Sequence, residues 1–96
     1  MSLYFVKHQH SPESCPAKDP LQGNMLLDHI NPINAQKFGI NLKGDAVLDN
    51  QHTFVLIIDA ENTDQIESFM IPFKQAGEVE IYPASTCEIV VDRHGC

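Results

Sequence analysis

The sequence predicts a small α+β domain with an antiparallel sheet, from its length, its strand-like segments and its helix-start signals. The chain has 96 residues, of which 43% are hydrophobic. A chain of this size buries about 65% of the surface that it exposes when unfolded, enough for one core. No internal repeat divides the chain. We therefore expect one domain over residues 1–96.

Strands are expected where apolar and polar residues alternate, or where apolar residues run on for a strand's length. Residues 54–58 are uninterrupted hydrophobics, which favours a central strand that is buried on both faces. The turn 49–51 joins this strand to the one before it. The expected strands are 3–10, 40–48, 52–59, 78–82 and 86–92.

Two helical regions are expected between these strands. Asp19 followed by Pro20 is an N-cap with proline at the first helical position. Asn31-Pro32 ends or kinks this helix, and a short second piece over 33–38 stops at Gly39.

The later helical region starts with a capping-box pattern. Asn62 is the N-cap and Gln65 follows three residues on. Pro72 lies inside the helix and predicts a kink, and Gly77 ends it.

The resulting order, β-α-β-β-α-β with a C-terminal strand added, is the split βαβ arrangement called ferredoxin-like. Right-handed crossovers place the first and third strands in the middle of the sheet and the second and fourth at its edges. Both helical regions then cover one face, and the other face needs a partner.

Strand alternation assigns side chains to these two faces. We expect purely apolar sets under the helices and mixed sets on the open face. The helix-side set is Leu3, Phe5, Val79 and Ile81, and the open-face set is Tyr4, Val6, His8, His10, Glu78, Glu80 and Tyr82.

His8-x-His10 is the strongest candidate for chemistry. Two imidazoles on one face of a strand have Cα atoms about 6.5 Å apart, from which both can reach one ion. The turn after this strand carries Cys15, and Cys87 begins the last expected strand. Imidazole and thiolate ligands suit zinc, nickel or copper rather than magnesium or calcium. The preferred ligands are His8, His10, Cys15 and Cys87.

Other donors are secondary to these four. The topology brings His52 and Glu80 to the same end of the sheet, where Glu80 is a ligand, an orienting partner or an edge-strand charge. The remaining donors, expected at the surface or in the tail, are His29, His94 and Cys96. The plainer interpretation is solvated histidines at a strand end together with inert thiols.

The element order and two stretches of sequence resemble the dimeric α/β-barrel superfamily. These stretches are His8-Gln9-His10 through Cys15-Pro16, and Pro83-Ala84-Ser85-Thr86-Cys87-Glu88. The chain is most similar to small uncharacterised single-domain members and, more loosely, to a nickel-binding group with a histidine on the first strand. The resemblance implies a homodimer in which two sheets pack face to face around a cavity. The superfamily includes monooxygenases, isomerases, haem enzymes and metal binders, so the fold does not decide the function.

Charge and composition exclude several classes of partner. Thirteen acidic residues against six basic ones give a net charge of −7, which disfavours nucleic acid and anionic membranes. We expect neither a membrane span nor a signal peptide, because no apolar run has membrane-spanning length and Met1-Ser2-Leu3-Tyr4 lacks the basic and apolar regions of a signal peptide. Its three cysteines are an odd number, which suits reduced thiols and a cytoplasmic location.

The sequence therefore favours one function and leaves one alternative. The first is a cytoplasmic transition-metal protein with a His/Cys site on the open face, whose role is sensing, storage or catalysis. The alternative is a cofactor-independent enzyme, monooxygenase- or isomerase-like, or a small-ligand binder that uses the barrel cavity. That cavity would be furnished by Tyr4, His8, Phe54 and Tyr82.

Overall fold

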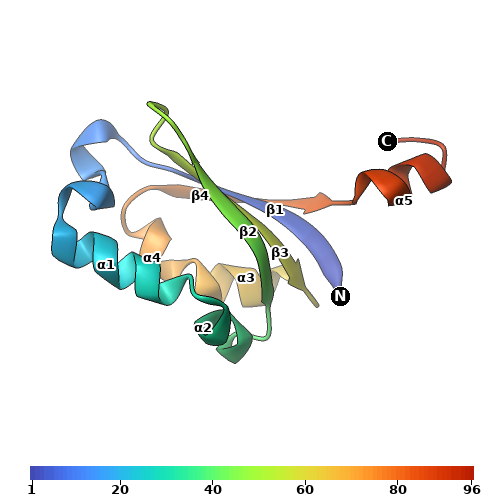
Figure 1. The fold of residues 1–96 in the computed structure, drawn as a ribbon, viewed down its shortest axis with the longest axis horizontal. Helices are drawn as coiled ribbons and strands as arrows, with labels where there is room; N and C mark the ends of the chain where they lie inside the picture. The colour runs from blue at the N-terminus through green and yellow to red at the C-terminus, as the bar shows by residue number, and fades with distance from the viewer.

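The computed structural model covers residues 1–96 and shows a four-stranded antiparallel sheet with every helix except the last gathered on one side (Figure 1). The strands lie in the order β2-β3-β1-β4, so β1 and β3 are central, as the sequence predicts. Their bounds are β1 (Ser2–Gln9), β2 (Asn41–Leu48), β3 (Thr53–Ala60) and β4 (Glu78–Ala84).

The predicted start of the first helix is confirmed, and the second helix begins at Pro32, one residue earlier than predicted. The Asp19 side chain accepts a hydrogen bond from Leu21 N at 3.0 Å and opens α1 (Pro20–His29). Asn31 caps α2 (Pro32–Lys37), which ends before Gly39 at a φ of 76°. Two short 3-10 turns, η1 (Pro12–Ser14) and η2 (Pro16–Lys18), connect β1 to α1.

The later helical region is interrupted where proline requires it. Asn62 accepts a hydrogen bond from Gln65 N at 3.3 Å and begins α3 (Thr63–Phe69). A second piece, α4 (Ile71–Lys74), follows after Met70, because Pro72 has no N–H to continue the first helix.

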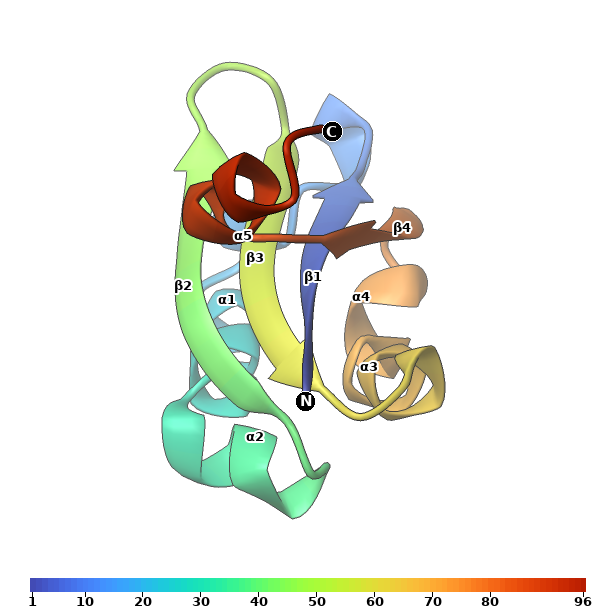
Figure 2. The same cartoon turned by 90° about the vertical axis from the view of Figure 1, so that its right-hand side faces the viewer.

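The predicted fifth strand is wrong. Residues 87–92 form a helix, α5 (Cys87–Asp92), in which Thr86 Oγ1 accepts a hydrogen bond from Ile89 N at 3.3 Å. A hydroxyl that caps the first turn favours helix at a place where no neighbouring strand offers a ladder. Figures 1 and 2 show α5 projecting away from the helices that cover the sheet.

The face predicted for the β1 side chains is also wrong. Val6 and His8 are buried, whereas Phe5 is 36% exposed on the uncovered face. Directly opposed residues in an antiparallel ladder share a face, and Phe5 pairs with Tyr82 while His8 pairs with Val79. The assignment for β4 holds, because Val79 and Ile81 pack against the core.

The core lies between the sheet and α1–α4. It contains buried side chains of β3 such as Leu56 and Ile58, together with Ile66, Phe69 and Met70. The expectation that β3 is buried on both faces fails at Ile57, which is 44% exposed on the uncovered face. The candidate residues of β1, β3 and β4 therefore lie on two different surfaces, one under the helices and one open.

Candidate metal centre

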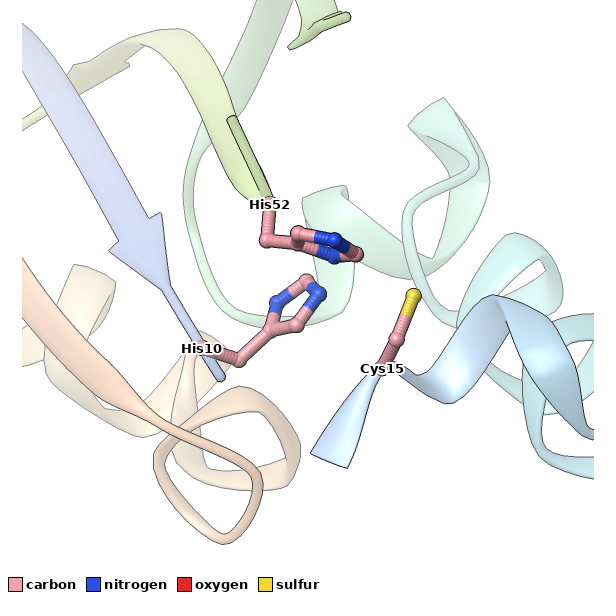
Figure 3. Close-up of side chains that lie close together, drawn as sticks. All are labelled: His10, Cys15 and His52. Atoms are coloured by element: carbon pink, nitrogen blue, oxygen red, sulfur yellow. The ribbon is translucent and has the colours of Figure 1, made fainter. Parts of the chain in front are cut away.

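Three donor residues from distant parts of the chain meet at one end of the sheet. One donor atom each from His10, Cys15 and His52 lies within 4.8 Å of the others, and all three residues are half-buried. Figure 3 shows the three side chains directed toward one another. Tetrahedral zinc holds such donors about 3.5 Å apart, so the donors need to approach by about an ångström to share an ion.

The backbone explains why these residues converge. His10 follows the last residue of β1, and its N–H donates to the carbonyl of His52 at 3.1 Å. His52 belongs to the turn between β2 and β3 and has a φ of 49°, an unusual backbone for a non-glycine residue. Cys15 joins η1 to η2, where the chain folds back toward the strand end. The site is thus made by a strand end and two turns.

His10 has unsatisfied hydrogen-bonding capacity. Both of its ring nitrogens are buried, and neither has a hydrogen-bond partner. Burial lowers the pKa of His10, and the neighbouring His52 lowers it further. The imidazole is therefore neutral at pH 7, the form in which a ring nitrogen can bind a metal.

His8 lies next to this group but deeper, under the helices. Its ring is 5.3 Å from that of His10 and 5.4 Å from that of Phe73, centroid to centroid. Burial lowers the pKa of His8, His10 lowers it further, and a hydrogen bond with the Phe73 backbone partly offsets them. His8 Nε2 is buried without a partner.

The structure brings together two of the four ligands preferred from the sequence, His10 and Cys15, with the secondary candidate His52. Cys87 is exposed at the start of α5. It follows β4 beyond Ala84, which pairs with Leu3 at the opposite end of β1 from His10. A strand of this length spans about 25 Å, so Cys87 is remote from the cluster.

Glu80 belongs to the open face and to a different network. It lies 3.9 Å from Lys7 and accepts a hydrogen bond from the Tyr82 hydroxyl. That hydrogen bond raises the pKa of Tyr82. The cluster itself lies on the helix-covered side, so the predicted placement of a His/Cys site on the open face is wrong.

The remaining donors have other positions. His29 is half-buried on α1, where its Nε2 lies 2.6 Å from the Phe69 carbonyl and its ring stacks on Phe69 at 4.6 Å. His94 and Cys96 are exposed in the C-terminal tail. They are outside the three-residue cluster.

A pocket of about 590 Å³ opens from the cluster. His8, His10, Cys15 and His52 line one part, and the rest is walled by α1, the β2–β3 turn, Phe54 and Phe73. A volume of this size is typical of small-molecule sites. An ion held by the cluster would therefore face a cavity rather than a packed core.

Comparison with known proteins adds no family to this description. No protein-family model matches the chain, and no curated protein matches it. None of the helices has the length and apolar character needed to cross a membrane.

Proposed function

We propose that this domain binds one transition-metal ion, zinc, nickel or copper, through His10, Cys15 and His52. The observation that carries the proposal is His10, whose two buried ring nitrogens have no partner beside a thiol and a second imidazole. A buried polar atom without a partner is costly, and an ion removes that cost for at least one nitrogen. A mixed nitrogen and sulfur donor set favours these metals over magnesium or calcium.

His8 is assigned to the wall of the site. It lines the pocket and stands against the ring of His10, but it is outside the group of donors that lie within 4.8 Å of one another. The His8 ring restricts the orientation of the His10 ring by packing against it, not by a hydrogen bond.

Cobalt(II) titration under reducing conditions tests the proposal, because cobalt substitutes for zinc and reports thiolate ligation by a near-ultraviolet absorption band. Wild type should bind one equivalent at pH 7 with this band and release the ion as the pH falls toward 5, where protons compete for the ligands. Cys15→Ser should lose the band, and His10→Ala should lose binding. His94→Ala, a change in the exposed tail, is the matched control. Unchanged binding in both Cys15→Ser and His10→Ala would overturn the proposal.

The same proposal includes a cytoplasmic ferredoxin-like domain that forms a homodimer through its open face. The strand order and the helices on one side support the fold. The open face supports the dimer, since Phe5, Ile57 and Tyr82 are 36%, 44% and 43% exposed there. A contiguous apolar patch of this kind is typical of an interface.

A cofactor-independent enzyme or small-ligand binder remains the alternative, and the pocket is the observation that favours it. His8 and Phe54 line the pocket, whereas Tyr82 belongs to the open face. That function would retain its activity or ligand after the metal is removed, so the metal-free protein distinguishes the two.

A further inference from the structure

Only three protein donors converge at the proposed metal centre, and they do so at the edge of a cavity. His10, Cys15 and His52 all line the pocket as well as forming the cluster. A four-coordinate ion held by three side chains keeps one position for an outside ligand. That position would face the pocket, because the pocket is the space that the three donors share.

The walls of this pocket are mainly apolar. Leu26 and Leu27 of α1 and Ile30, the C-cap that follows it, line the pocket. Leu26 and Ile30 also touch the edge of the core, but no residue of α1 is fully buried. Phe54 and Phe73 add aromatic surface from the sheet and α4. An amphipathic helix normally buries its apolar face in the core, so α1 leaves apolar surface for a guest.

The charge at the cluster determines the kind of head group. A divalent ion with one thiolate and two neutral imidazoles keeps one net positive charge. Apart from these donors and His8, the only ionisable side chain that lines the pocket is Asp49, which is acidic. The ion is therefore the only positive charge in the pocket that could bind the negatively charged head group of a small molecule.

We infer that the pocket takes a small monoanion with an apolar body, whose anionic donor atom occupies the fourth position on the metal. This inference rests on the metal site proposed above. The head group is a carboxylate or a thiolate, which are both monoanionic donors, and the body is aliphatic or aromatic.

The test uses cobalt-loaded protein and sodium octanoate, with visible absorption of the cobalt as the readout. Octanoate should shift the visible bands in wild type, because a new ligand changes the field at the ion. Octyltrimethylammonium, which has a similar chain and a positive head, should leave the bands unchanged. The metal-free protein should show no octanoate binding by calorimetry.

Two leucines of α1 provide matched variants. Leu27 lines the pocket and Leu21 does not, and they are 64% and 72% exposed, so either can be replaced with little effect on folding. Leu27→Asn should weaken octanoate binding about tenfold or more while leaving cobalt affinity unchanged, because it removes one apolar side chain from the wall. Leu21→Asn should bind octanoate as wild type does.

The possible results distinguish binding of the anion from binding of the metal. Cobalt bands that octanoate leaves unchanged would overturn this inference and leave the metal site standing. Equal octanoate binding with and without metal, or equal binding of the cation, would overturn the coordination of the head group. Failure to bind cobalt at all would overturn the metal site and the inference with it.

Discussion

The ring of His10 stands edge-on to the ring of His52, with centroids 5.3 Å apart and an angle of 74° between the planes. The two residues are also joined through the backbone, since His10 N donates to His52 O at 3.1 Å. This bond fastens the β2–β3 turn to the end of β1. The two imidazoles are thus held side by side by the sheet before any ion arrives, which lowers the ordering cost of binding.

The first prediction compares His52 with Cys87. His52→Ala should weaken zinc affinity at least about 100-fold, since it removes a ligand rather than an orienting partner, whose loss costs 10–100-fold. Cys87→Ser should leave the affinity unchanged, because Cys87 is exposed on α5 at the other end of β1. Competition against a chromophoric chelator measures both. A large loss of zinc affinity in Cys87→Ser, with no loss in His52→Ala, would contradict this site and favour the ligand set predicted from the sequence.

The second prediction concerns the stability of the metal-free domain. His8 and His10 have lowered pKa values in the folded state, so above about pH 6.5 both states are neutral and no stability is lost. Below that pH these histidines are protonated in the unfolded chain but remain neutral in the folded domain. The free energy of unfolding should then fall by up to about 1.4 kcal/mol per pH unit for each histidine that stays neutral, until the folded-state pKa is reached.

Urea unfolding at pH 7.5, 6.5 and 5.5 in the presence of a chelator measures this fall. His8→Phe should make the fall shallower, leaving the contribution of His10, and His94→Phe, in the exposed tail, should not change it. A wild-type free energy that does not change over this range would contradict the burial of neutral histidines.

The third prediction concerns the open face. Ile57→Asp places a charge among Phe5, Ile57 and Tyr82 and should convert a dimer to a monomer, because an unpaired charge at the centre of an interface is costly. Ile33→Asp on α2, at a position that is 74% exposed, is the control and should remain dimeric. Sedimentation at micromolar concentration distinguishes them. A wild-type monomer of 10.7 kDa would remove the dimer without affecting the metal site.

The local elements were predictable because their signals are local. Asp19 and Asn62 cap helices through side chains that accept hydrogen bonds from nearby N–H groups, and a sequence pattern records such contacts. Pro72 breaks its helix for an equally local reason. Thr86 carries the same capping signal for α5, and it was outweighed by the alternation of residues 86–92.

The site was harder to predict because it depends on which way β1 faces. Alternation puts the histidines of β1 in the polar set, yet His8 is buried and Phe5 is 36% exposed. A shift of one residue in facing moves every side chain of a strand to the other side, and alternation alone does not choose between the faces. His52 depends on the β2–β3 turn, and its donor role appears only when that turn is placed beside the end of β1.

The last prediction concerns Gly77, which lies just before β4 against the end of β1. A Cβ at this position would collide with the carbonyl oxygen of Gln9 and come within 3.0 Å of His10 Cα. Backbone cannot move aside as a flexible side chain does, so Gly77→Ala should cost about 1–3 kcal/mol of unfolding free energy. It should also weaken zinc binding, because the clash displaces the segment that carries His10. Gly44→Ala, where a Cβ meets nothing within 4 Å, is the matched control and should be neutral or slightly stabilising. Urea unfolding of the metal-free proteins and zinc competition measure the two effects. Equal stability and equal zinc affinity in the two variants would show that the close approach of Gly77 to β1 does not position the site.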